Sequence, residues 1–129
     1  MGRSAMIIED DPALRRLAEV ALGRIGGWSV RGAESLDAAA ALGPPAPDVY
    51  IVDVMLGEGD GRSILRLFDN GSLARAPFLF MTALVRPAAR AEYIALGAIG
   101  VIEKPFDPMT LAATVEAALA AHEGRRNNS

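Results

Sequence analysis

The chain has 129 residues, of which 51% are hydrophobic and 22% charged, and its formal net charge is −3. This length and composition indicate one soluble globular domain with a real apolar core. The acidic balance argues against direct nucleic-acid binding, and the absence of cysteine excludes disulfides, zinc–thiolate sites and thiol nucleophiles. The first residues fit neither a signal peptide nor a membrane span, so we expect no membrane association and a cytoplasmic location.

Short apolar runs alternate along the chain with segments of helical period. The run at 5–8 predicts a strand, and the spacing of apolar residues over 13–25 predicts a helix. The expected elements that follow are a weak strand at 28–32, a helix at 35–42, a strand at 49–52, a helix from about residue 62, a strand at 78–81, a helix at 88–96, a strand at 99–102 and a helix at 108–121. Residues 122–129 are expected to form a polar tail or the start of a linker, so the domain should occupy residues 1–121.

Five successive strand–helix units predict the fold class. Right-handed crossovers place the helices on both faces of a parallel sheet, so we expect an α/β protein with a three-layer α/β/α sandwich and a five-stranded parallel sheet. In such a sheet the C-terminal ends of all strands lie along one edge, and ligands bind in the crevice there. Residues that end different strands therefore become neighbours in space.

Chemically active side chains follow four of the predicted strands. Glu9 and Asp10 follow the first strand, Asp53 the third, Thr82 the fourth and Lys104 the fifth. Carboxylates held close together raise one another's pKa unless a cation neutralises them. Mg²⁺ prefers oxygen ligands and bridges protein carboxylates to phosphoryl oxygens. This edge of the sheet is therefore predicted to hold Mg²⁺ and a phosphoryl group.

Each of these residues also has a purely structural explanation. Asp11 precedes Pro12 and is better explained as a helix N-cap than as a metal ligand. Taken alone, Asp53 would be a turn residue, Thr82 a strand residue with a packed methyl group, and Lys104 a solvated lysine. A cis bond to the following proline would, however, aim the Lys104 side chain. The combination of residues favours the functional interpretation.

Five short motifs occur in order at the predicted strand ends. They are Ile-Ile-Glu-Asp-Asp-Pro at 7–12, Val-Asp-Val-Met-Leu at 52–56, Asp-Gly at 60–61, Met-Thr-Ala at 81–83 and Glu-Lys-Pro-Phe at 103–106. Together they resemble the receiver domains of bacterial two-component response regulators, the CheY-like superfamily, over residues 4 to about 121. The resemblance implies a flavodoxin-like fold with strand order 2-1-3-4-5.

The resemblance also implies a role for each matching residue. Asp53 would be the phosphoacceptor, and Thr82 and Lys104 would contact phosphoryl oxygens. Mg²⁺ would be bound by Glu9, Asp10, Asp53 and the backbone carbonyl of Met55. The switch region would include Ala83, Val101 and Pro105. The implied function is that of a signalling switch that takes a phosphoryl group from a phosphohistidine. Such a protein catalyses only its own phosphorylation and dephosphorylation.

The resemblance implies two kinds of partner, a phosphoryl donor and a receiver of the output. The donor would be a sensor histidine kinase or a histidine phosphotransfer protein, and the output a downstream protein or an effector domain outside this sequence. A homodimer through residues 87–121 is an arrangement that the resemblance allows. The alanines on the expected outer side of the last helix, however, do not favour the salt-bridged form of that dimer.

The chain departs from the family pattern at several positions. Gly57 stands where a proline is common, which predicts a looser loop. Val101 stands where an aromatic residue is common, so coupling through a turning ring does not carry over. Met55 and Leu84 are apolar at positions that flank the phosphoryl group, and they offer nothing to orient an attacking water. We therefore expect slow autodephosphorylation.

Three alternative functions are weighed against the same residues. A haloacid-dehalogenase-type phosphatase needs a second acid two residues after its nucleophile, where Met55 stands. A flavodoxin-like carrier needs small polar residues after its first strand, where Glu9 and Asp10 would repel a flavin phosphate. A phosphorylation-independent interaction domain has no need of the combined Asp53, Thr82 and Lys104.

Overall fold

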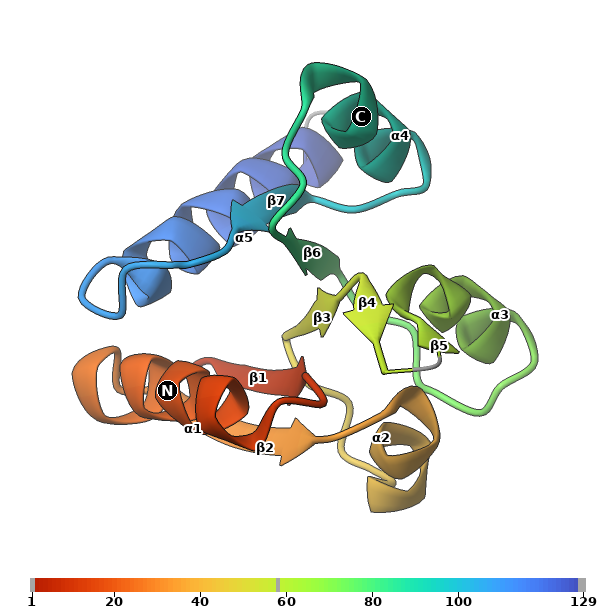
Figure 1. Cartoon of the computed structure of the whole chain (residues 1–129), viewed down its shortest axis with the longest axis horizontal. Coiled ribbons are helices and arrows are strands. Elements are labelled where there is room, and N and C mark those ends of the chain that lie inside the picture. Colours follow the sequence, from red (N-terminus) through yellow and green to blue (C-terminus); the bar gives the residue numbers. More distant parts are fainter. Residues whose placement is uncertain (1, 58, 128–129) are drawn as a thin grey trace.

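A computed structural model describes residues 2–57 and 59–127, and it shows a parallel sheet enclosed by helices (Figure 1). The five strands of the sheet are β1 Ser4–Ile8, β2 Ser29–Ala33, β3 Val49–Asp53, β6 Phe78–Thr82 and β7 Gly100–Glu103. Their spatial order is β2-β1-β3-β6-β7, with every pair parallel. A separate antiparallel pair is formed by β4 Met55–Leu56 and β5 Gly59–Asp60. Without this small pair, the order is the predicted 2-1-3-4-5.

The helices form the two outer layers. They are α1 Pro12–Val20, the π-helical η1 Ala21–Ile25, α2 Leu36–Leu42, the 3₁₀-helical η2 Gly61–Ser63, α3 Ile64–Asp69, α4 Pro87–Ala95 and α5 Leu111–Asn127. Figure 1 shows α1 and α5 on one side of the sheet and α2, α3 and α4 on the other. The predicted three-layer α/β/α sandwich is confirmed. No helix in the described part of the chain is long and apolar enough to cross a membrane.

The core is divided by the sheet into two apolar layers. Along β3, Val49 and Ile51 pack toward α1 and α5, whereas Tyr50 and Val52 pack toward α2 and α3. All residues of β3 and β6 are buried, because helices cover both faces of the sheet. This explains why these strands are continuous apolar runs in the sequence rather than alternating ones.

The first helix begins and ends for identifiable reasons. The Asp11 side chain accepts hydrogen bonds from the backbone N–H groups of Ala13 and Leu14, which confirms its prediction as an N-cap. The predicted helix over 13–25 is α-helical only to Val20 and continues as one π-helical segment. Gly26 then allows a close approach, because a Cβ there would lie 2.5 Å from the Cβ of Ala112 on α5.

The last helix differs from its prediction. It begins at Leu111 and continues to Asn127, beyond the predicted end of the helix at residue 121. Arg3, which precedes β1, donates hydrogen bonds to both Glu116 and Glu123. These bonds hold the final turns in place, and the segment is rich in good helix formers. Whether the chain leads into a linker beyond this helix stays a prediction.

Candidate functional site

The strand ends enclose a hollow of about 410 Å³ that contains most of the residues singled out in the sequence. It is lined by Glu9, Asp10, Asp11, Leu14, Asp53, Met55, Thr82, Ala83, Leu84 and Lys104. The topology produces this grouping because β1, β3, β6 and β7 are adjacent and parallel. The predicted metal ligands and phosphoryl contacts therefore all lie at one place. Of the three predicted switch residues, only Ala83 lines the hollow.

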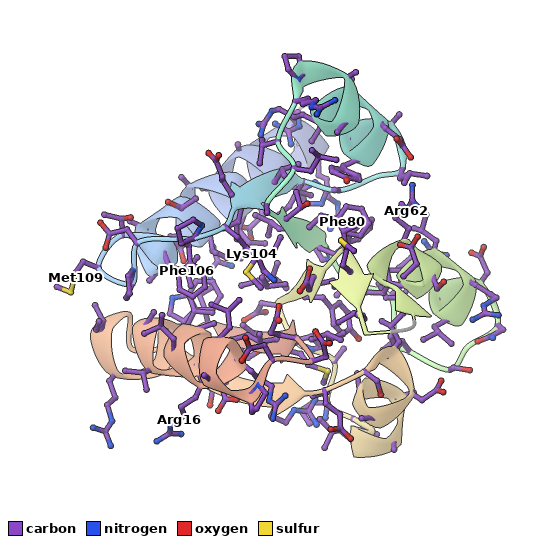
Figure 2. All side chains as sticks on the ribbon, in the orientation of Figure 1. Arg16, Arg62, Phe80, Lys104, Phe106 and Met109 are labelled. Atoms are coloured by element: carbon purple, nitrogen blue, oxygen red, sulfur yellow. The ribbon has the colours of Figure 1, made fainter. Side chains whose placement is uncertain are left out.

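Lys104 lies between two buried carboxylates. Its Nζ atom is 2.5 Å from Asp53 Oδ2 and 3.0 Å from Glu9 Oε2. Glu9 is 1% exposed and Asp53 is 4% exposed. Figure 2 shows Lys104 near the centre of the molecule, close to the strand ends. The Lys104–Pro105 peptide bond is cis, as the sequence suggested.

A negative charge on Glu9 is unfavourable in this cluster, because Glu9 is buried beside Asp53. Burial, followed by the hydrogen bond to Asp53, raises the pKa of Glu9 to about 7, and the ammonium of Lys104 opposes this only in part. Burial disfavours the charged form of Lys104, but its bonds to Asp53 and Glu9 outweigh that effect and raise its pKa. One ammonium thus neutralises two buried acids incompletely.

The same acids fit a hard divalent cation. Glu9, Asp10 and Asp53 can each offer a carboxylate oxygen, and these oxygens lie within 4.8 Å of one another. Glu9 Oε2 is buried, and its contact there is the ion pair with the Lys104 ammonium, which is shared with Asp53 and does not meet hydrogen-bond geometry at Glu9. Such an oxygen requires compensation, and an oxygen-binding cation would supply it.

The backbone after β3 holds the Asp53 carboxylate in place. The N–H of Met55 donates to Asp53 Oδ1 at 3.0 Å, and the N–H of Gly61 donates to the Val54 carbonyl at 2.8 Å. A Cβ at Gly61 would collide with the Asp53 carbonyl, so glycine is required where the chain returns past the strand end. Gly57 has a φ of 57°, a left-handed conformation that favours glycine over the expected proline.

The rim of the hollow is partly apolar. Met55 is 75% exposed and Leu84 is 50% exposed, and both line the opening. Thr82 is buried below them, and its Oγ1 accepts a hydrogen bond of 3.0 Å from the N–H of Leu84. The hydroxyl hydrogen of Thr82 remains available to donate into the hollow.

Val101 and Pro105 lie away from the hollow. Val101 pairs in register with Phe80 on β6 and is partly buried against the core layer that contains α4. There Phe80 packs against Tyr93 of α4, with 5.3 Å between the ring centroids. An aromatic contact thus exists beside Val101, formed by residues that the sequence analysis did not single out. Pro105 is exposed and follows Lys104.

The sequence analysis also missed an ion-pair connection between the site loop and α4. Arg62 bonds Asp60 Oδ2 at 2.6 Å and Glu92 Oε1 at 2.7 Å. Figure 2 shows Arg62 reaching into the space between α3 and α4. The Asp-Gly-Arg sequence signals the local pair, but nothing in the sequence indicates the partner on α4, thirty residues away.

A flavodoxin-like sheet with an acidic hollow at its strand ends, lined also by a threonine and a lysine, is the architecture of the CheY-like receiver domains. The sequence matches the response regulator receiver domain family over residues 5–116, and the chain belongs to this family of two-component systems. It is 36% identical over 120 residues to the transcriptional regulatory protein GltR of Pseudomonas aeruginosa, covering 92% of this chain and 49% of that protein.

Two further relatives agree with this assignment. The transcriptional regulatory protein TrcR of Mycobacterium tuberculosis is 33% identical, over 88% of this chain and 44% of that protein. The chemotaxis protein CheY4 of Vibrio cholerae has a solved structure with a TM-score of 0.80 and 25% identity, covering 92% of this chain and 99% of that one. The chain spans about half the length of the curated relatives that it matches.

Proposed function

We propose that this chain is a phosphorylation-controlled switch in which Asp53 accepts a phosphoryl group from a phosphohistidine. The observation that carries the proposal is the buried Asp53 carboxylate, held by the Met55 N–H on one oxygen and by Lys104 on the other. A mere turn residue would not need burial at 4% exposure beside a second acid. The arrangement instead supports an aimed nucleophile with a charge-neutralising group next to it.

The transfer step follows from these contacts. A carboxylate oxygen of Asp53 forms a bond to phosphorus as the phosphorus–nitrogen bond of the donor breaks, and the bonding pair leaves on the imidazole nitrogen. The Lys104 ammonium offsets charge on the phosphoryl oxygens, and the Thr82 hydroxyl donates a hydrogen bond to one of them. Glu9, Asp10, Asp53 and the carbonyl of Met55 would hold Mg²⁺, which would supply further neutralisation of the phosphoryl charge.

The new dianionic group would then change the surface of the domain. It draws Thr82 and the neighbouring Ala83 inward, a local electrostatic event that biases a two-state element. The change would reach partners through residues 87–121, with Val101 and Pro105 in the switch region. The domain would catalyse only its own phosphorylation and dephosphorylation.

The relatives suggest what surrounds this switch. Because two curated relatives are transcriptional regulators about twice as long, an effector domain outside this sequence is one proposed output, and a separate protein is the other. A sensor histidine kinase or a histidine phosphotransfer protein is the proposed donor, in the cytoplasm. A homodimer through residues 87–121 belongs to the same proposal.

Phosphoryl uptake tests the role of Asp53. With Mg²⁺ and acetyl phosphate, intact mass should show one phosphoryl group on the wild-type chain and on Asp69→Asn, a matched control in which the changed acid is exposed on α3. The Asp53→Asn variant should take up none, because an amide oxygen is a poor nucleophile. Addition of EDTA should abolish uptake by the wild type. Equal labelling of Asp53→Asn and wild type would refute the assignment.

A further inference from the structure

A second hollow lies at the opposite end of the sheet. Its volume is about 480 Å³, against about 410 Å³ at the acidic site. We call it the basal groove, and it is lined by Leu65, Phe68, Arg75, Ala76, Pro77, Phe78, Leu96, Gly97, Ile99, His122 and Arg126. Phe78 begins β6 and Thr82 ends it, so roughly 13 Å of strand separates the basal groove from the acidic site.

The floor of the basal groove is apolar and aromatic. The rings of Phe68 and Phe78 lie 5.9 Å apart between centroids, and Leu65, Leu96 and Ile99 extend the apolar surface. Elements from both outer layers of the sandwich contribute, because Leu65 and Phe68 belong to α3 whereas His122 and Arg126 belong to α5. A concave apolar floor of this kind accepts a projecting side chain.

The polar lining of the basal groove is cationic. Its charged residues are Arg75 and Arg126, His122 is a further polar residue, and none of its lining residues is acidic, although the chain as a whole carries a formal charge of −3. Arg75 lies over the Phe68 ring, 5.3 Å from its centroid, and bonds Asp69 through one nitrogen. A guanidinium has five N–H donors, so it can bind a second carboxylate as well. Arginine beside buried aromatic rings is typical of interface hot spots.

We propose that the basal groove docks a segment of a protein partner in which a bulky apolar side chain is flanked by carboxylates. The apolar side chain would cover Phe68 and Phe78, and the carboxylates would meet Arg75 and Arg126. This complementarity favours a peptide over a membrane, since lipid binding needs apolar side chains that project rather than a hollow that receives them. Because the basal groove and Asp53 lie at opposite ends of the sheet, the partner can stay bound while the acidic site is occupied.

The test uses a defined probe, a fluorescein-labelled peptide of sequence Glu-Glu-Leu-Phe-Asp-Asp, added to the full chain. Fluorescence anisotropy should show binding that weakens with salt, and amide chemical shifts should change around the basal groove. The double variant Arg75→Glu/Arg126→Glu should bind about tenfold more weakly. The matched control Arg16→Glu/Arg24→Glu, with the same change in net charge on exposed residues of α1 and η1, should bind like wild type. Both variants should keep the wild-type circular dichroism spectrum.

Several results would overturn the proposal. Equal affinity of the Arg75/Arg126 variant and wild type would do so, as would shift changes centred on the acidic hollow. A peptide with lysines in place of its acids should bind far more weakly, and equal binding would contradict the charge argument. Absence of peptide binding up to about 1 mM, alone or together with binding to phosphatidylglycerol vesicles, would likewise refute a peptide-docking role.

Discussion

Lys104 pairs with two buried carboxylates at once. Its ammonium contacts Asp53 and Glu9, while Asp10 stands at the opening of the same hollow. Three acids and one ammonium leave a negative excess, and burial together with the neighbouring Asp53 raises the pKa of Glu9 although Lys104 pairs with it. The same excess makes the site attractive to a cation.

Met55 is expected to control how long a phosphoryl group survives on Asp53. Its side chain is 75% exposed at the rim of the hollow and offers no group that could orient water. The variant Met55→Asn should lose phosphate about tenfold faster, which is less than the roughly hundredfold that general acid–base catalysis usually contributes, because an amide can orient water but cannot take its proton. The measurement is the decay of phosphorylated mass after removal of acetyl phosphate.

A matched control separates this effect from a general loss of apolar surface. Met109 is 70% exposed but does not line the hollow, and Met109→Asn should decay at the wild-type rate. Faster decay in the wild type than in Met55→Asn would contradict the proposed role of the apolar rim.

At the scale of elements, the sequence predicted those parts that depend on local pattern. The strands β3 and β6 are continuous apolar runs because both faces of the sheet are covered, and the Asp11 cap follows from residues next to it. The pair β4–β5 was not predicted, because two-residue strands leave no periodic signal. The extended α5 carries Glu123, which bonds Arg3 more than one hundred residues away, and no local pattern indicates such a contact.

The site likewise combines features that the sequence predicts with contacts that depend on tertiary packing. Strand ends can be aligned from the expected topology, so the sequence alone places Glu9, Asp53 and Lys104 together. Their hydrogen-bond geometry and the link from Arg62 to Glu92 depend on how loops and helices pack. Those features required the structure.

The contact between η1 and α5 gives a prediction for an element. A Cβ at Gly26 would lie 2.5 Å from the Cβ of Ala112 and 2.7 Å from the Leu22 carbonyl, so Gly26→Ala must push the end of η1 away from α5. We expect a loss of about 1–3 kcal/mol in the free energy of unfolding, as for other overpacked sites. Urea denaturation followed by circular dichroism measures this change.

Gly124 provides the control within α5 itself. A Cβ there meets nothing within 4 Å, so Gly124→Ala should leave stability unchanged or raise it by up to about 1 kcal/mol through helix propensity. If Gly26→Ala were as stable as Gly124→Ala, the close packing of η1 on α5 would not be a constraint on the fold.

At the scale of the whole molecule, the acidic site lowers the free energy of unfolding of the domain. The sheet has apolar cores on both faces, but its functional edge buries two acids side by side. Burying charge that is only partly compensated costs free energy, and a site that binds a cation must accept this cost in its metal-free state. The stability of the metal-free domain should therefore depend on the protonation of the site.

The pH dependence of unfolding in EDTA tests this effect. Burial raises the pKa of Glu9 from 4.5 to about 7, so the folded chain holds this proton more tightly than the unfolded chain does. The resulting stability is complete below about pH 4.5 and is lost as the pH rises to about 7. The loss amounts to at most about 3 kcal/mol. A Glu9→Gln variant lacks the titrating group, so its unfolding free energy should fall less over this interval and should exceed that of the wild type at pH 8.

Urea titrations at several pH values give the two curves, and the exposed Glu103→Gln provides a control that should follow the wild type. Addition of Mg²⁺ at pH 8 should stabilise the wild type, because a ligand that binds only the folded state raises its stability by mass action. The same addition should stabilise Glu9→Gln less, since one carboxylate ligand is gone. Parallel pH curves for wild type and Glu9→Gln would show that the titration of Glu9 does not cause the pH dependence of stability.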